Sequence, residues 1–157
     1  MTDGGSSIPE VQALLRTLAA GRDVAELGTA FGEGAAAMAE TARSVVTVES
    51  DPERVAAARG RLTAFANVEV LEGDCYALLR DRRPFGLVFA DGGRPLDWES
   101  ILALVEPGGI LVKDDLTPGL PVEGDSVREF LLRDPRLAAV EVLTTPSTAA
   151  IVAVRVA

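Results

Sequence analysis

The sequence predicts one α/β domain over residues 1–157, with a doubly wound sheet made mostly of parallel strands. Short apolar runs alternate with helical segments, and no interdomain linker interrupts the alternation. An acidic residue also stands at or near the carboxyl end of five successive apolar runs. These acids are Glu26, Glu49, Asp74, Asp91 and Asp114. Because ligands of open α/β sheets bind outside the carboxyl ends of the strands, we expect the five acids to surround a ligand.

The elements follow in order along the chain. The first helix is predicted over residues 8–20, because Pro9 suits its first turn and Gly21 suits its end. Its buried stripe is expected to consist of Val11, Leu14, Leu15 and Leu18. Further helices are expected over residues 34–41, 52–62, 75–80, 96–105 and 126–133. Strands are expected at the apolar runs 24–27, 45–48, 68–71, 87–90, 110–113, 138–143 and 149–156, and residues 116–121 should form a loop.

A glycine-rich stretch connects the first predicted strand to the second helix. Residues 26–34 read Glu-Leu-Gly-Thr-Ala-Phe-Gly-Glu-Gly and lead into an alanine-rich segment. A strand that enters a glycine-rich turn and then a helix is typical of a ligand-binding loop. Glu49 lies about one βαβ step later, where nucleotide-type folds place an acid on a ribose. Together these features predict a cofactor that carries a ribose.

Loop register and charge decide which cofactor is favoured. Residues 32–37 match the dinucleotide pattern G-x-G-x-x-A, but they begin four residues after Gly28, where the strand ends. If the pattern is counted from Gly28 instead, Ala30 occupies the position where a dinucleotide fold needs glycine so that the pyrophosphate can approach the backbone. Glu33 would also place a negative charge beside the phosphates. The acid-rich edge would repel phosphates and attract a cation. S-adenosylmethionine, a sulfonium with a ribose and no phosphate, fits best, although each acid taken singly suits helix capping or a turn equally well.

Five segments resemble the class I methyltransferases that use S-adenosylmethionine, and more narrowly the O-methyltransferases related to catechol and caffeoyl-CoA methyltransferases. They are E-L-G-T-A-F-G from Glu26, V-T-V-E-S-D-P-E from Val46, L-E-G-D-C from Leu71, L-V-F-A-D-G-G-R from Leu87 and E-P-G-G-I-L-V-K-D-D-L from Glu106. The resemblance implies a Rossmann-like, seven-stranded sheet in the order 3-2-1-4-5-7-6, with strand 7 antiparallel.

The resemblance also implies the cofactor-binding residues. Glycines would let the backbone approach the methionine portion, Glu49 would accept the ribose hydroxyls, and Asp74 with the Cys75 backbone would read the adenine. The alternative for Asp74 is the N-cap of the following helix, and both roles are compatible. The full predicted set is Glu26, Gly28, Thr29, Ala30, Gly32, Gly34, Glu49, Ser50, Gly73, Asp74, Cys75 and Asp91.

Catalysis is expected to involve Asp91 and Arg94. The resemblance implies an Mg²⁺ site at Asp91, Asp114 and Asp115, where oxygen ligands suit a hard cation. Two residues depart from the family pattern: Asp115 replaces an asparagine, and Arg94 replaces a lysine and cannot act as a base. Arg94 could still stabilise an oxyanion. The alternative is that Asp114 and Asp115 are polar loop residues and that Arg94 pairs with one of them.

Composition narrows the function classes. A net charge of −9 disfavours nucleic acid as a partner, because phosphate neutralisation needs Lys and Arg. One cysteine and no histidine exclude an internal disulfide, Ser-His and Cys-His mechanisms, and the usual zinc ligand. Cys75 is expected to be a wall residue of the cofactor site. The polar amino terminus and the absence of a long apolar run predict a cytoplasmic protein without a membrane segment.

The sequence therefore predicts an S-adenosylmethionine-dependent methyltransferase that acts on a hydroxyl oxygen of a small molecule. The alternatives are a methyltransferase for another acceptor class and a cofactor-binding protein with little catalysis. An NAD-type reductase lacks support, since Tyr76 and Lys113 form no Tyr-x-x-x-Lys pair. Only one helix precedes the first strand, so the substrate pocket is thinly covered. A second subunit in a homodimer, a bulky substrate or a reduced, weakly active enzyme would each explain this.

Overall fold

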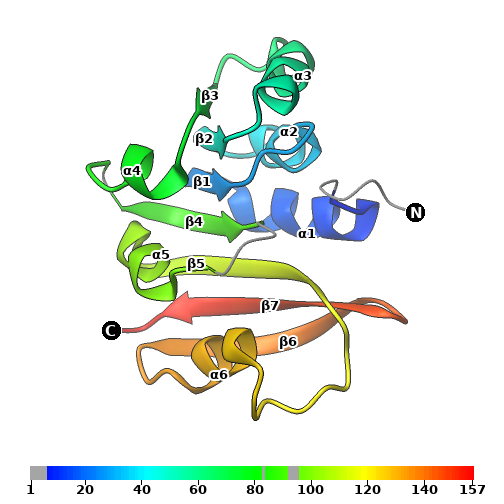
Figure 1. Ribbon diagram of the computed structural model, residues 1–157, viewed down its shortest axis with the longest axis vertical. Coiled ribbons are helices and arrows are strands. Elements are labelled where there is room, and N and C mark those ends of the chain that lie inside the picture. The colour runs from blue at the N-terminus through cyan, green and yellow to red at the C-terminus, as the bar shows by residue number, and fades with distance from the viewer. Residues whose placement is uncertain (1–6, 83, 92–95) are drawn as a thin grey trace.

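The computed structural model describes residues 7–82, 84–91 and 96–157, which form one sheet with helices on both faces (Figure 1). The helices are α1 (Pro9–Ala19), α2 (Glu33–Ala39), α3 (Pro52–Leu62), α4 (Cys75–Leu79), α5 (Trp98–Leu104) and α6 (Ser126–Arg133). The strands are β1 (Asp23–Leu27), β2 (Ser44–Glu49), β3 (Val68–Glu72), β4 (Phe85–Ala90), β5 (Val105–Leu116), β6 (Leu137–Thr145) and β7 (Thr148–Arg155).

The strand order confirms the predicted topology. Within the described residues the sheet has seven strands in the order β3-β2-β1-β4-β5-β7-β6. Strands β1 to β5 pair in parallel, whereas β7 is antiparallel to both β5 and β6. The carboxyl ends of β1, β2, β4 and β5 therefore meet at one edge of the sheet. This edge is where the sequence placed the ligand.

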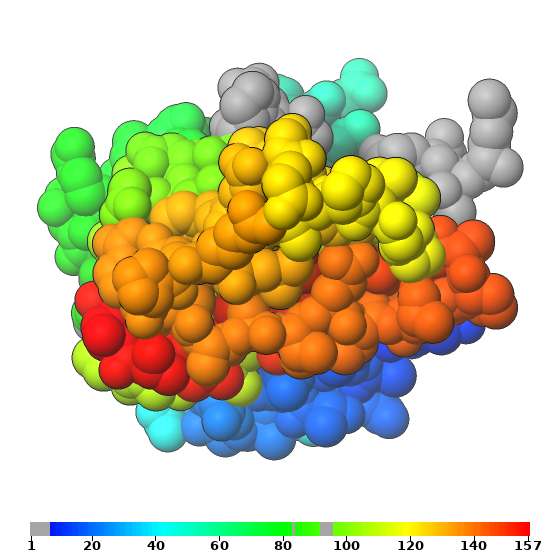
Figure 2. Space-filling view, turned by 90° about the horizontal axis from the view of Figure 1, so that it is seen from below, coloured from blue at the N-terminus to red at the C-terminus, as the bar shows by residue number. Residues whose placement is uncertain are grey.

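Two hydrophobic clusters hold the helices against the sheet. On one face, Val11 and Leu15 of α1 pack with Met38 of α2 and Leu62 of α3. The other face carries residues of α4, α5 and α6, such as Leu79, Ile101 and Leu131. Seen from the β6 edge of the sheet, the yellow-to-orange segment that contains α6 lies on one side and the blue segment that contains α1 lies on the other (Figure 2). Strands β1, β2 and β4 are apolar on both faces because helices cover both, as is usual for parallel strands. Along the described chain, no helix combines the length and apolarity needed to cross a membrane.

The segment around β5 differs most from the predicted boundaries. Helix α5 begins at Trp98 rather than at residue 96, because the Asp97 side chain caps it by accepting a hydrogen bond from the Ser100 amide at 3.1 Å. Strand β5 begins at Val105, five residues before the predicted start. Its register against β4 shifts between Phe85 and Leu87. The Glu-Pro-Gly-Gly segment, which lies between the predicted helix and the predicted strand, is thus part of an irregular strand start.

Candidate functional site

The loop between β1 and α2 folds back over the end of β2. The amides of Gly28 and Thr29 donate to the Val48 carbonyl at 2.9 and 3.1 Å. Gly28 and Gly32 have φ of 96° and 90°, a region that side chains strongly disfavour, and Ala30 has φ of 48°. A non-glycine residue held at positive φ is a sign of a constrained functional loop. The predicted cofactor residues 28–32 therefore lie in a constrained turn, in which Thr29, Ala30 and Gly32 are buried.

Gly34 is required by close packing rather than by its backbone angle. A Cβ built at this position would lie 2.6 Å from Glu26 Oε2 and 3.3 Å from Ser7 Oγ. Any side chain would displace the Glu26 carboxyl, which is 1% exposed and lies on β1. The structure thus brings together Glu26 and Gly34, two residues that were predicted to serve the same cofactor.

A chain of buried hydroxyl groups holds Glu26. Thr47 Oγ1 donates to Glu26 Oε1 at 2.6 Å, and the hydroxyls of Thr29 and Thr47 are 2.5 Å apart. Burial raises the pKa of Glu26 well above its ordinary value, and the hydrogen bond from Thr47 opposes that rise. Thr47 was missed by the sequence reasoning. The sequence gives one hint of its role, which is that Thr47 places a hydroxyl group inside the valine run of β2.

Glu49, the predicted ribose acceptor, ends β2 and is held by three backbone amides. Ala30 donates to Oε2 at 2.9 Å, while Ser50 and Asp51 donate to Oε1 at 2.9 and 3.1 Å. A carboxylate offers about four acceptor positions, so one remains for a ligand hydroxyl. The carboxylate is therefore fixed in position by the protein before any ligand arrives.

Asp74 fulfils its alternative role. Its Oδ1 accepts the Ala77 amide at 2.8 Å, which makes it the N-cap of α4. Gly73 precedes it with φ of 145°, and its amide donates to the Glu49 carbonyl at 2.9 Å, which ties this turn to the end of β2. Cys75 is partly buried at the first position of α4. The adenine-reading role of this turn remains a prediction.

A second group of acids lies at the ends of β4 and β5. Burial and the Asp114 carboxylate raise the pKa of Asp91 to about 7, and burial also raises the pKa of Asp114. Asp114 is 6% exposed, and its Oδ1 has no hydrogen-bond donor among the described residues. The ammonium group of Lys113 lies 3.9 Å from that oxygen. Lys113 is the second residue that sequence reasoning missed, although a single lysine inside an apolar strand was a signal.

The structure does not gather the predicted metal ligands. Asp115 is exposed, with φ of 60°, whereas Asp114 is buried. Among the residues described, no three Asp, Glu, Cys or His side chains are arranged to hold a metal ion. The magnesium site at Asp91, Asp114 and Asp115 is therefore not supported, because the ammonium group of Lys113 lies 3.9 Å from Asp114 Oδ1 and Asp115 is exposed to solvent. Arg94 lies outside the described residues.

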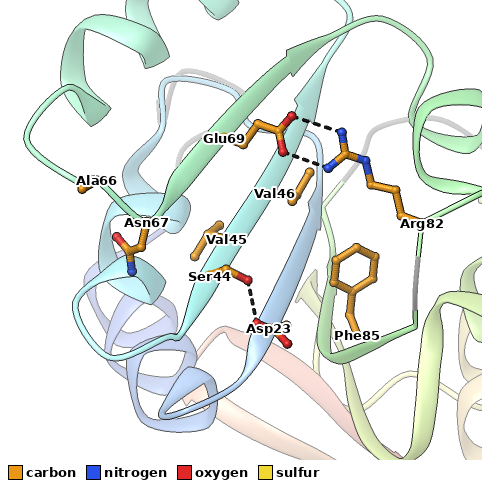
Figure 3. Close-up of a pocket in the computed structure, with 9 residues that line it drawn as sticks. All are labelled: Asp23, Ser44, Val45, Val46, Ala66, Asn67, Glu69, Arg82 and Phe85. Atoms are coloured by element: carbon orange, nitrogen blue, oxygen red, sulfur yellow. Dashed lines mark hydrogen bonds and ion pairs between the residues drawn. The ribbon is translucent and has the colours of Figure 1, made fainter.

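A separate hollow of about 510 Å³ opens at the opposite edge of the sheet (Figure 3). It lies near the amino ends of β1, β2 and β4, between Asp23, Ser44 and Phe85. Arg82 and Glu69 form a two-pronged ion pair across it, at 2.8 and 3.1 Å. None of the predicted site residues lines this hollow.

The chain is similar in sequence to protein-L-isoaspartate O-methyltransferase from Rhodopseudomonas palustris (strain BisB5). The two are 36% identical over 121 residues, which are 76% of this chain and 52% of the relative. The chain thus spans about half the length of the curated relatives it matches. No protein-family model matches the chain.

Solved structures show the same fold over nearly all of the chain. The O-methyltransferase TomG from Streptomyces achromogenes, in complex with S-adenosylmethionine, superposes with a TM-score of 0.80 at 23% identity and covers 100% of this chain and 84% of its own. An O-methyltransferase from Bacillus cereus, in complex with S-adenosylhomocysteine, gives 0.78 at 21% identity, over 96% and 83%. The predicted resemblance to the class I methyltransferases is confirmed at the level of fold.

Proposed function

We propose that this chain, which has the class I methyltransferase fold, binds S-adenosylmethionine and methylates an oxygen atom of its acceptor. The observation that carries the proposal is the turn formed by residues 28–32. Gly28, Ala30 and Gly32 all have positive φ there, and the Ala30 amide is fixed by Glu49. A bare, rigid backbone at the carboxyl end of β1 is what a small-molecule cofactor needs for close approach.

The residues present fit this cofactor better than a dinucleotide. Gly34 has no side chain to displace the Glu26 carboxyl beside it. Glu49 accepts three backbone amides and keeps one acceptor position for a ribose hydroxyl. The acids at the ends of β1, β2, β4 and β5 give this edge a negative field, which favours a sulfonium and opposes a pyrophosphate. We assign cofactor binding to Glu26, Gly28, Thr29, Ala30, Gly32, Gly34, Glu49, Ser50, Gly73, Asp74, Cys75 and Asp91.

Asp91 is the residue suited to take a proton from an acceptor hydroxyl. When bound, the cofactor supplies an electrophilic methyl group. The acceptor hydroxyl must therefore lose its proton so that its oxygen becomes a good nucleophile. With its pKa raised to about 7, Asp91 is close to half protonated at neutral pH, and a general base works best near that point. Arg94 would stabilise the resulting oxyanion. No part of this proposal requires a divalent metal ion.

Two acceptor classes follow from two different observations. The structural likeness to O-methyltransferases over the whole chain favours a hydroxyl of a small molecule. The sequence similarity to a protein-L-isoaspartate O-methyltransferase favours instead a carboxyl group of a peptide. A carboxylate is already ionised at neutral pH and needs no base. The substitution Asp91→Asn should therefore lower methylation of a catechol far more than methylation of an isoaspartyl peptide.

Ligand-dependent melting tests the cofactor assignment. At about 100 times Kd, S-adenosylhomocysteine should add about 2.7 kcal/mol to the free energy of unfolding, which is easily seen as a rise in Tm. NADH at the same concentration should leave Tm unchanged. Stabilisation by NADH together with none by S-adenosylhomocysteine would refute the proposed function.

A further inference from the structure

Lys113 is a buried cation at the carboxyl end of β5. It pairs in register with Ile151 of β7, and only 12% of its side chain is exposed. Its ammonium group donates a hydrogen bond to the Asp114 carbonyl at 2.8 Å and lies 3.9 Å from Asp114 Oδ1. Burying an ammonium group is costly unless opposite charge is close, so this lysine depends on the neighbouring carboxylates.

The carboxylates depend equally on the lysine. Asp114 Oδ1 is buried without a hydrogen-bond donor among the described residues, so the charge of that oxygen is balanced only through space. Asp91 follows β4, and Phe89 of β4 pairs in register with Val112 of β5, so Asp91 and Asp114 end neighbouring parallel strands. Asp91 is partly buried and Asp114 is buried, and the ammonium group of Lys113 lies beside Asp114. The two acids therefore already have a cation close to them.

A divalent ion would compete with that lysine for the same charge. In addition, Asp115 is exposed, so it does not complete a cage of three carboxylates. Mg²⁺ demands near-octahedral oxygen ligands, and an ammonium group 3.9 Å from one of those oxygens repels it. The residues fit an internal ammonium better than a metal.

We propose that the ammonium group of Lys113 is the resident cation of the Asp91–Asp114 pair and excludes divalent metal ions from it. The inference rests on the proposed function, because it describes the acceptor side of that same site. It makes Lys113 a positioning residue, which keeps the two carboxylates ionisable and in place without touching the cofactor.

Direct Mn²⁺ binding, followed by electron paramagnetic resonance on the intact chain, tests this without any activity measurement. The unaltered protein should show no saturable Mn²⁺ binding, with or without S-adenosylhomocysteine. Lys113→Met keeps the length of the side chain and removes its charge, so this variant should bind Mn²⁺ saturably. Its Kd should lie at least about tenfold below the lower limit that the titration sets for the Kd of the unaltered protein. Lys113→Arg is the matched control; it keeps the charge and should remain silent.

Further variants separate the possible outcomes. Gained Mn²⁺ binding should disappear in Lys113→Met combined with Asp114→Asn. If Lys113→Met alone fails to fold, adding Asp114→Asn should restore folding, since one uncompensated buried charge is then gone. Saturable Mn²⁺ binding by the unaltered protein, a folded Lys113→Met that gains none, or failure of Asp114→Asn to rescue an unfolded one would each overturn the proposal. If the unaltered protein does not bind S-adenosylhomocysteine, only the proposed function is refuted, because Mn²⁺ binding is measured independently of the cofactor.

Discussion

Glu49 and Asp114 are carboxylates at the same edge of one sheet, and they are buried to nearly the same extent, at 8% and 6% exposed. Their surroundings are nevertheless opposite. Glu49 accepts three backbone hydrogen bonds, whereas Asp114 Oδ1 accepts none from the described residues and lies 3.9 Å from the ammonium group of Lys113. One acid is held by the backbone, and the other is balanced by a single side chain.

Backbone geometry explains the difference. After β2 the chain turns at once, so that the amides of Ser50 and Asp51 point back at the Glu49 carboxylate. After Asp114 the strand continues to Leu116, and its register against β7 shifts between Lys113 and Leu116. No backbone amide of the described residues donates to Asp114 Oδ1. Glu49, on the proposed cofactor side, is thus fixed by the backbone before any ligand binds. Asp114, on the proposed acceptor side, depends on the charge of the Lys113 side chain, which a substitution can remove.

Removal of the well-held acid should have the largest effect. Glu49→Ala leaves three backbone amides without their acceptor, so the free energy of unfolding should fall by about 3 kcal/mol. The lost ribose contact should also weaken S-adenosylhomocysteine binding by about 2 to 4 kcal/mol, or roughly 30- to 900-fold. Urea denaturation and calorimetric titration measure the two losses separately.

Glu49→Gln is the matched control for that prediction. It keeps one acceptor oxygen and the same shape, so it should lose less of both quantities than the alanine variant. Unchanged cofactor affinity in Glu49→Ala would show that the end of β2 does not contact the ribose.

The second prediction concerns the pH dependence of the acceptor side. The folded protein raises the pKa of Asp91 from 3.8 to about 7, so folding favours the protonated carboxyl. The corresponding stability is present in full below the ordinary pKa and is lost as pH rises through the folded value. Compared with Asp91→Asn, the unaltered protein should therefore lose about 2 to 3 kcal/mol between pH 5 and pH 8.

Urea denaturation of both proteins at the two pH values measures this difference. The same stability loss in the Asp91→Asn variant would show that Asp91 ionises freely in the folded protein. A pKa near the ordinary value would also remove Asp91 as the proposed proton acceptor.

The sequence predicted the architecture closely, because the fold is encoded by local patterns. Apolar runs, helix caps and glycines placed the strands and helices, and Pro52–Leu62 and Ser126–Arg133 were predicted to the residue. The start of β5 was missed because the apolar run begins only at Ile110, whereas the strand extends back to Val105, which pairs with Phe85 of β4. The order of the strands came from the family resemblance and not from the periodicity.

The candidate site was predictable in part, for a related reason. Glu26, Glu49 and the glycine turn could be placed because they follow one another along the chain. The neighbourhood of Asp114 could not, because it depends on which way side chains point at an irregular strand end. Thr47 and Lys113 act through contacts with neighbours whose position the sequence does not reveal, and both were passed over.

The third prediction concerns the acid that the backbone does not hold. Asp114→Asn removes a buried carboxylate that lacks a hydrogen-bond donor, but it also deprives the Lys113 ammonium group of the opposite charge 3.9 Å away. The second effect should outweigh the first, so the free energy of unfolding at pH 8 should fall by about 1 to 2 kcal/mol, less than for Glu49→Ala. Urea denaturation of the two variants side by side gives the comparison. A more stable Asp114→Asn would mean that Lys113 does not depend on this carboxylate.

The smallest effect is expected at Asp115, the acid that neighbours Asp114 but is exposed. Its φ of 60° favours Asn nearly as well as Asp, and water screens its charge, so Asp115→Asn should change the free energy of unfolding by less than about 0.5 kcal/mol. Asp115→Ala is the matched control, since a left-handed backbone should cost alanine about 1 kcal/mol. Asp115→Asn also introduces the asparagine that the resemblance to catechol-type methyltransferases implies at this position, yet it leaves Lys113 in place, so titration with Mn²⁺ should show no binding. Mn²⁺ binding gained by this substitution alone would show that the additional carboxylate, and not the lysine, keeps the metal out, and the contrast between Glu49 and Asp114 would then lose its cause.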